Sequence, residues 1–369
     1  METTEGGRTY IVPSEDDPAF FNPAMELNRD ITVAVLRAAP QRYLDRDDPT
    51  YLDAMAAAGI RGVRAGLEGY DVLCCDRSES ALEFTRENLQ RHDVDATVLH
   101  DDVRRVLIDS RFDVVDIDPF GSPIPYIDAA FFGTDGLLCV TATDTAPLCG
   151  AHHKAGIRRY GSVPANTVDH AEIGLRTLIG ALVRRGASHD VAATPVLSHS
   201  SRHYHRTYLA LNEGAKVADA ALEKVGFIEH CQSCWWRETV SGLAPPLRVH
   251  CPVCDVGIRR IGPLYLGEYR EVAFVEEVSA AIDETMGTET QAERLLARLA
   301  DEAAIVGHLD HHALCDRLDI PAGPIDEVLR GLSERNYTAT RTHFGGTTFK
   351  TDAPTDAVKD VIEATADSA

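Results

Sequence analysis

The chain has 369 residues, of which 44% are hydrophobic, and its formal net charge is -22. This length exceeds one ordinary core, so two or three domains are expected, and the apolar content excludes a disordered protein. No apolar stretch reaches the roughly 18 residues of a membrane span, and residues 1–6 lack the basic and apolar regions of a signal peptide. The sequence therefore predicts a cytoplasmic protein with no membrane contact, and nothing in it indicates an obligate protein partner.

Lysine is scarce in this acidic chain. Only five of its 36 basic residues are lysines: Lys154, Lys216, Lys224, Lys350 and Lys359. Acid excess with little lysine favours a halophilic source over a merely acidic protein, because salt shortens the range of charge repulsion. The same screening weakens repulsion between this protein and nucleic acid. The charge therefore does not exclude an RNA or DNA substrate.

The first half of the chain alternates short apolar runs with helical patterns. This alternation predicts right-handed βαβ units, and hence an α/β fold with a mostly parallel sheet. The predicted strands are 51–53, 71–75, 96–100, 113–117 and 136–141, with helical segments at 60–67 and after Ser78.

Acidic residues follow the first three of these strands. They are Asp53, Asp76 and Asp102. In nucleotide-binding doubly wound folds the acid after the second strand holds ribose hydroxyls, a role that suits Asp76, and Asp102 could accept from an adenine amino group. Acidic strand ends are common in an acidic protein, so surface carboxylates are the alternative.

The loop after the first strand bears on which nucleotide is bound. A dinucleotide fingerprint requires Gly-x-Gly-x-x-Gly against pyrophosphate, whereas only Gly59 and Gly62 occur here. The loop is more compatible with a ligand that lacks phosphates, such as S-adenosylmethionine. The carboxylate of that cofactor could pair with Arg61 or Arg29, although either arginine could equally be a surface residue.

The segment Asp118-Pro119-Phe120-Gly121 follows the fourth strand. Asp118 and the carbonyl of Pro119 offer acceptors, and Phe120 offers a ring on which a planar base can stack. This combination suits an exocyclic amino group on a nucleobase. It resembles the Asp/Asn-Pro-Pro-aromatic motif of amino-methyltransferases. The alternative is a buried strand followed by a turn.

Beyond residue 150, basic and aromatic residues cluster. A helix is predicted over 168–185 and strands over 191–197 and 207–211. Arginines can grip phosphates and aromatic rings can stack on unpaired bases, so these clusters favour RNA over plain surface loops. They comprise Lys154, Arg158-Arg159-Tyr160 and Arg202-His203-Tyr204-His205-Arg206.

Two Cys-x-x-Cys pairs follow, Cys231/Cys234 and Cys251/Cys254. Four thiolates at this separation match a structural zinc site with no open position for catalysis. Two disulfides are the alternative, which a cytoplasm disfavours.

The last third of the chain is helical and ends in a predicted hairpin. Helices are predicted over 291–304, 311–318 and 325–334, and strands over 337–340 and 347–351. This order indicates a winged-helix module, with a dimerisation or packing domain as the alternative. We expect one domain over residues 1–222 and a second over 223–369, containing a zinc region (223–280) and a winged-helix-like module (285–355).

Taken together, these strings resemble the archaeal branch of the tRNA (guanine-26) dimethyltransferase family over nearly the whole chain. The matching strings are residues 21–30 (FNPAMELNRD), 58–62 (AGIRG), 116–121 (DIDPFG), 149–150, 158–161, 203–206, the paired Cys-x-x-Cys, and 342–352.

The resemblance implies a Rossmann-like class I methyltransferase domain that uses S-adenosylmethionine. Its product would be N2-methyl- and N2,N2-dimethylguanosine at position 26 of tRNA. It implies Asp118 as the catalytic residue, with Pro119 and Phe120 beside it. The implied cofactor contacts are Arg29, Arg61, Asp76, Asp102 and Val103, to which Asp53 is added from its strand-end position.

One residue departs from the family pattern, and two other functions remain open. Val103 stands where the family often has Ala, so the resemblance implies a contact through its backbone and not through its side chain. The alternatives are an amino-methyltransferase acting on another tRNA guanine or another nucleobase, and a non-catalytic RNA-binding protein with the same fold.

Overall fold

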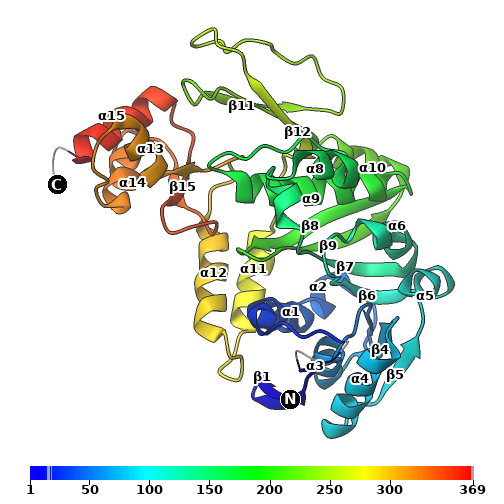
Figure 1. Ribbon diagram of the computed structural model, residues 1–369. Helices are drawn as coiled ribbons and strands as arrows, with labels where there is room; N and C mark the ends of the chain where they lie inside the picture. The colour runs from blue at the N-terminus through cyan, green and yellow to red at the C-terminus, as the bar shows by residue number, and fades with distance from the viewer. Residues whose placement is uncertain (15–16, 18, 367–369) are drawn as a thin grey trace.

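A seven-stranded sheet forms the centre of the computed structural model, which describes residues 1–14, 17 and 19–366 (Figure 1). Its strand order is β5-β4-β3-β6-β7-β9-β8. The first five of these are parallel, and β9 runs antiparallel between β7 and β8. The predicted mostly parallel sheet is confirmed. The strands are β3 (Thr50–Asp53), β4 (Asp71–Asp76), β5 (Ala96–His100), β6 (Phe112–Ile117), β7 (Thr134–Ala142), β8 (Val191–Ser200) and β9 (His205–Glu213).

Both faces of this sheet are buried, as a parallel sheet requires. Side chains alternate along each strand: Tyr51 and Val114 pack into one core layer, and Leu52 and Val115 into the other. The helices that pack with the sheet are α1 (Glu26–Ala38), α3 (Ile60–Leu67), α4 (Glu79–Arg91), α5 (Val103–Asp109), α6 (Ile124–Gly133), α9 (His170–Ala187) and α10 (Ala215–Leu222).

The chain order places a ligand site at one edge of the sheet. Strands β3, β4 and β5 follow one another outward, and the chain then returns to add β6 on the other side of β3. Loops diverge at such a switch point, and ligands bind there, at the carboxyl ends of the strands. Asp53 and Asp118 end these two neighbouring strands.

Several elements escape the sequence patterns. The N-terminus forms a hairpin of β1 (Glu2–Glu5) and β2 (Arg8–Ile11), and no strand was predicted there. Short helical turns connect the larger elements: η1 (Pro23–Met25), α2 (Pro40–Tyr43), α7 (Thr145–Leu148) and α8 (His153–Tyr160).

A three-stranded antiparallel sheet, ordered β11-β10-β12, follows the seven-stranded sheet. Its strands are β10 (Val225–His230), β11 (Arg237–Ser241) and β12 (Arg259–Tyr265). Two helices, α11 (Val272–Ala280) and α12 (Glu289–Asp301), then pack against each other and against α1.

The chain ends in a small module with its own core, which stands to one side in Figure 1. It contains α13 (His311–Leu318), α14 (Ile325–Glu334), α15 (Thr355–Ala366) and the sheet β13-β15-β14 (Leu309–Asp310, Thr348–Thr351, Ala339–Arg341). The helix predicted over 291–304 forms as α12, but its side chains join the main core instead. The two helices and hairpin of the winged-helix prediction are present, whereas α15 was not predicted. The domain division at residue 222 stays a prediction.

A buried ionic cluster joins this module to the main body. The Lys350 ammonium of β15 lies 3.0 Å from Glu172 of α9 and 2.8 Å from Glu302, and it contacts the Tyr269 hydroxyl at 3.1 Å. All four side chains are buried. Burial raises the pKa of Glu172, but Lys350 and Arg176 outweigh it and hold that pKa well below its usual value.

None of the helices in the described part of the chain combines the length and hydropathy of a membrane span.

Candidate active site

A cavity of about 310 Å³ opens at the carboxyl ends of β3 and β6. Six of the residues predicted to act at the site line it together: Arg29, Asp53, Arg61, Asp118, Pro119 and Phe120. The structure therefore brings these residues, spread over almost 100 positions of the chain, to one place.

The loop that leads from β3 into α3 fits closely against the sheet. Gly59 adopts a left-handed conformation with φ of 73°, which favours glycine. A Cβ at Gly62 would lie 2.3 Å from the Cys74 sulfur, so only glycine fits there. The amide of Gly62 donates to Asp53 Oδ2 at 3.0 Å, and this bond holds Asp53 at the start of α3.

Asp53 is buried and carries an unusual pKa. Burial, followed by the charge of Asp116, raises the pKa of Asp53 to about 7. A carboxyl group at this position can therefore exchange its proton near neutral pH.

Asp118 is held by Arg61. Its Oδ2 accepts from Arg61 Nη2 at 2.5 Å and from Arg61 Nε at 3.0 Å, while among the described residues its Oδ1 accepts no hydrogen bond. Arg61 also donates to Asn28 Oδ1 at 2.7 Å and to Thr32 Oγ1 at 3.1 Å. The guanidinium thus fixes Asp118 with one oxygen left for another donor.

A buried ion pair stands beneath this contact. Arg206 donates to Asp116 through both terminal nitrogens, at 2.7 and 2.8 Å, and both side chains are fully buried. Tyr51 donates to Asp116 Oδ2 at 3.0 Å, and Arg61 lies 3.6 Å from that oxygen. Burial alone would raise the pKa of Asp116. The charges of Arg206 and Arg61 lower this pKa by more than burial raises it, so the carboxylate stays charged.

Arg29 is anchored from the N-terminal hairpin. Its Nε donates to Glu5 Oε2 at 2.7 Å and its Nη2 to Glu5 Oε1 at 2.5 Å. Nη1 makes no hydrogen bond among the residues described, so Arg29 keeps one donor for a ligand in the cavity.

Two exposed rings meet edge to face at the mouth of the cavity. Phe120 is 78% exposed and Phe20 is 52% exposed, and their ring centroids lie 4.5 Å apart at an interplanar angle of 76°. The turn that carries Phe120 is held next to the end of β7, because the Gly121 amide donates to Thr143 Oγ1 at 2.7 Å, and Thr143 directly follows that strand. A flat ligand entering here would meet aromatic surface.

Asp76 and Asp102 lie at the ends of the next two strands and do not line this cavity. Asp76 accepts from the amides of Ala57 and Ser78, at 3.0 and 2.8 Å. Asp102 caps α5, and its hydrogen bond with Arg104 lowers its pKa to about 2. Val103, the first residue of α5, is buried.

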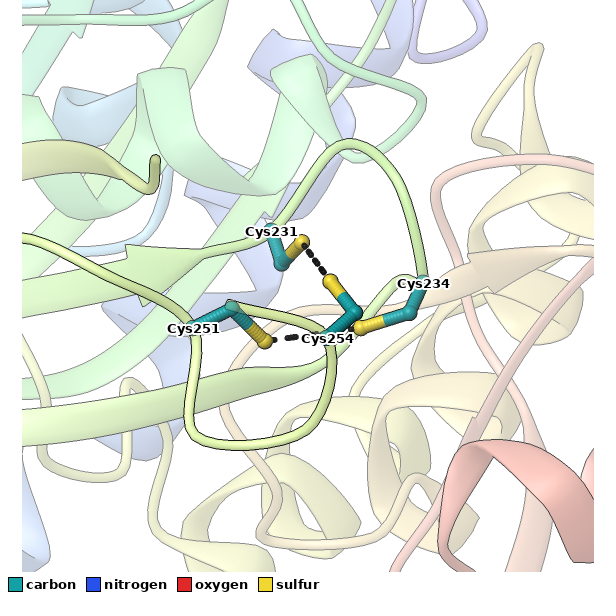
Figure 2. Close-up of side chains that lie close together, drawn as sticks. All are labelled: Cys231, Cys234, Cys251 and Cys254. Atoms are coloured by element: carbon teal, nitrogen blue, oxygen red, sulfur yellow. Dashed lines mark hydrogen bonds between the residues drawn. The ribbon is translucent and has the colours of Figure 1, made fainter. Parts of the chain in front are cut away.

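The four predicted zinc ligands converge elsewhere (Figure 2). Cys231 and Cys234 follow β10, while Cys251 and Cys254 precede β12, and all four sulfurs lie within 4.8 Å of one another. The sulfurs of Cys231 and Cys254, and those of Cys234 and Cys251, are 3.5 Å apart. Sulfurs around a tetrahedral zinc lie about 3.8 Å apart, and all four thiols are free. The cluster could therefore bind zinc.

Comparison with known proteins covers nearly the whole chain. A model of the N2,N2-dimethylguanosine tRNA methyltransferase family matches residues 3–363. The chain belongs to this family. It is 48% identical to the tRNA (guanine(26)-N(2))-dimethyltransferase of Haloarcula marismortui, over 100% of both chains, and 48% identical to that of Natronomonas pharaonis, over 98% of this chain and 100% of the relative.

A solved structure of the same family shares the fold. Trm1 from Pyrococcus horikoshii, in complex with S-adenosyl-L-methionine, matches with a TM-score of 0.89 and 33% identity, over 98% of this chain and 99% of that one. The family resemblance predicted from the sequence is confirmed. The haloarchaeal relatives agree with the halophilic source predicted from the lysine count.

Some residues of this dimethyltransferase site were not predicted to belong to it. Thr143, which directly follows β7, lines the cavity. His203 of the β8–β9 connection also lines it, whereas the sequence placed this residue in a cluster expected to contact RNA. The sequence predicts Asp116 as part of a strand and Arg206 as part of an RNA-binding cluster, whereas Arg206 is fully buried against Asp116. A charged residue in the middle of an apolar strand pattern, as at Asp116, was the available signal.

Proposed function

We propose that this protein transfers methyl groups from S-adenosylmethionine to the exocyclic N2 of guanosine at position 26 of tRNA, giving N2-methyl- and N2,N2-dimethylguanosine. The observation that carries the proposal is Asp118, held by Arg61 at the mouth of the strand-end cavity with one oxygen unengaged. Full-length similarity to enzymes named for this reaction supports it.

The target nitrogen is a poor nucleophile, because its lone pair is delocalised into the guanine ring. Asp118 Oδ1 and the Pro119 carbonyl can accept its two hydrogens, which would turn the lone pair toward the sulfonium methyl. Alignment of the reacting atoms supplies much of the rate. The Asp118 carboxylate disperses the positive charge that develops on nitrogen, and it can take the proton that leaves.

The base must leave the stacked RNA to reach this cavity. Phe120 offers an exposed face beside Asp118, and Phe20 already contacts its ring. We assign these two rings to the guanine. Stacking on an aromatic side chain offsets part of the free energy lost on unstacking the base.

The cofactor would lie along the strand ends next to the guanine. Arg29 would bind the cofactor carboxylate through its remaining Nη1 donor. Arg61 is already engaged in this structure, since it donates to Asp118, Asn28 and Thr32 and lies 3.6 Å from Asp116. Asp76 would hold the ribose, and Asp102 with the Val103 amide the adenine.

Binding of S-adenosylmethionine should depend on pH through Asp53. Burial, followed by the charge of Asp116, raises the pKa of Asp53 to about 7 in the free protein, so this carboxyl group is mostly protonated at pH 6. The cofactor brings a sulfonium and an ammonium, and these cations favour the ionised carboxylate. Binding should therefore release a proton, and the dissociation constant should fall by about five- to tenfold between pH 6 and pH 8. Calorimetry in buffers of different ionisation enthalpy measures both quantities. Asp53→Asn should remove the pH dependence, and equal affinity at both pH values in the unaltered protein would contradict the assignment.

We propose that the four-cysteine cluster holds one structural zinc ion. The two pairs of cysteines come from loops at the same end of the β11-β10-β12 sheet and meet sulfur to sulfur. Four thiolates fill a tetrahedral shell, so the ion would tie loops together and leave no position for substrate. Arg317 of α13 donates to the carbonyls of Gln232 and Ser233, which lie between Cys231 and Cys234. This cysteine loop therefore also contacts the C-terminal module.

Removal of this zinc should destabilise the protein without touching the active site. Cys251→Ser should lower metal content from one zinc per chain toward zero and reduce the free energy of unfolding by at least a few kcal/mol. Mass spectrometry of the metal and chemical denaturation measure the two effects. Cys315→Ser, at a buried cysteine outside the cluster, is the control for metal content. Stoichiometric zinc in the Cys251 variant would rule out the site.

The function itself is tested by mapping the modified nucleotide. Unmodified tRNA is treated with purified enzyme and S-adenosylmethionine at high salt, and its fragments are sequenced by mass spectrometry. Methylation of N2 at position 26 is expected. Methylation of another base would favour an amino-methyltransferase of different specificity, and binding of tRNA without any methylation would favour a non-catalytic RNA-binding protein.

A further inference from the structure

The Asp118 side chain depends on a single neighbour for its position. Among the described residues, only Arg61 bonds to its carboxylate, and both the Nε and the Nη2 of that arginine donate to Oδ2, at 3.0 and 2.5 Å. The Asp118 side chain is 19% exposed and has water on its other side. The direction in which Oδ1 points is therefore set by the place of the Arg61 guanidinium.

Helix α1 holds the other side of this guanidinium. Arg61 Nη2 donates to Asn28 Oδ1 at 2.7 Å, and Nη1 donates to Thr32 Oγ1 at 3.1 Å. Asn28 and Thr32 are four positions apart and lie on one face of the helix. They are 0% and 3% exposed, and neither is among the described residues that line the strand-end cavity. Both can therefore affect a reaction in the cavity only through Arg61.

The amide of Asn28 is satisfied on one side only. Its Oδ1 accepts from Arg61, whereas its Nδ2 is buried and has no hydrogen-bond partner in the part of the chain that is described. A buried donor without a partner lowers the free energy of unfolding, and an apolar side chain of similar shape would avoid this loss. Packing therefore does not account for an asparagine here, and what its polar group contributes is the bond to Arg61.

Thr32 supplies a second neutral acceptor. Its Oγ1 accepts from Arg61 and also from Arg206 Nη2, each at 3.1 Å. The hydroxyl therefore fixes two arginines relative to each other. A neutral oxygen at this place satisfies an N–H group of Arg61 without competing, as a carboxylate would, for the charge that pairs with Asp118.

We propose that Asn28 and Thr32 are positioning residues for methyl transfer. They fix the Arg61 guanidinium, which in turn fixes Asp118 Oδ1 toward the N2 hydrogen of the guanine. The next residue of the same helix, Arg29, would bind the cofactor carboxylate, so one turn of α1 sets the places of both reactants. The inference rests on the proposed function, because it concerns the carboxylate that accepts from N2.

Asn28→Leu tests the proposal. Leucine has the same branching and nearly the same size, and it removes both the bond to Arg61 and the unpartnered Nδ2. Single-turnover transfer at saturating tRNA and cofactor should slow by about ten- to a hundredfold, because a small misplacement of a reacting group costs rate of that order. The dissociation constants of both ligands and the midpoint of urea unfolding at high salt should stay unchanged. Loss of rate without loss of affinity marks an interaction that acts in the transition state.

Thr32→Val is the second variant, and it decides the question if Asn28→Leu does not fold. Valine keeps the shape of threonine and removes the hydroxyl, so the rate should fall as in Asn28→Leu, whereas Thr32→Ser should recover most of the lost rate. Thr177→Val is the matched control. Thr177 of α9 is 0% exposed and its Oγ1 has no partner among the described residues, so the control removes a buried hydroxyl that holds no arginine. It should transfer methyl groups at the normal rate.

Three results would overturn the proposal. They are a normal single-turnover rate in folded Asn28→Leu or Thr32→Val, a rate in Thr32→Ser as low as in Thr32→Val, and a rate loss that is accompanied by an equal loss of cofactor affinity or a lower urea midpoint. The last of these would assign the two residues to the fold alone. Failure of the proposed function is distinguishable, because it would appear in the unaltered enzyme, as tRNA that is bound but not methylated.

Discussion

Replacing Asp118 by Asn should reduce methyl transfer by about a hundredfold or more while S-adenosylmethionine still binds. Asn keeps the size of the side chain but removes the charge that would disperse positive charge on the guanine nitrogen and accept its proton. One oriented amide oxygen would remain as an acceptor, so residual activity is expected. Single-turnover methylation with saturating tRNA measures the chemical step, and calorimetry measures the cofactor.

A matched control for this variant is Asp135→Asn. Asp135 is a surface carboxylate paired with Arg111 at the start of β7, remote from the strand-end cavity. It should methylate at the normal rate. Near-normal transfer by Asp118→Asn would exclude Asp118 as the catalytic residue, and loss of cofactor binding together with transfer would indicate that its main partner is Arg61.

Replacing Arg206 by Met should cost about 3 to 5 kcal/mol of unfolding free energy, because it leaves Asp116 charged and buried. Tyr51 and Arg61 would remain near that carboxylate but would not replace the two short bonds from Arg206. Denaturation by guanidinium is itself ionic, so urea at a fixed high salt concentration is the suitable measurement.

The double variant Arg206→Met with Asp116→Leu separates the pair from the packing around it. When both charges are removed, no uncompensated ion is left, so the double variant should lose less stability than the two single variants added together. Additive losses would show that the two residues contribute independently. Arg206→Lys, which keeps the charge but not the paired geometry, should fall between Met and the unaltered protein.

The site residues at the ends of strands could be predicted from the sequence. In a parallel sheet the end of each strand has a known place, so Asp53 and Asp118 could be brought together from the alternation of strands and helices alone. The family resemblance added Arg29. This residue lies in a helix, so its place in the site could not be predicted from the ends of the strands. The Cys-x-x-Cys spacing predicted a cluster that the structure assembles in full.

Contacts between distant segments were not predictable. Arg206 reaches Asp116 across 90 positions, and Lys350, near the C-terminus, reaches Glu172 in the middle of the chain. In both cases a charged residue is buried, contrary to its usual preference, because its partner is buried with it. Local patterns hold no information about such partners.

The ionic cluster around Lys350 has a consequence for how the substrate is handled. Because a buried lysine between two buried carboxylates would be costly to pull apart, we expect the catalytic body and the C-terminal module to move as one piece. The two parts then form one rigid body, and the protein does not bind its substrate by closing one domain onto the other. The deformation that brings a guanine into the cavity must then come almost entirely from the RNA. Transfer RNAs in which the target base unstacks easily should therefore be modified first.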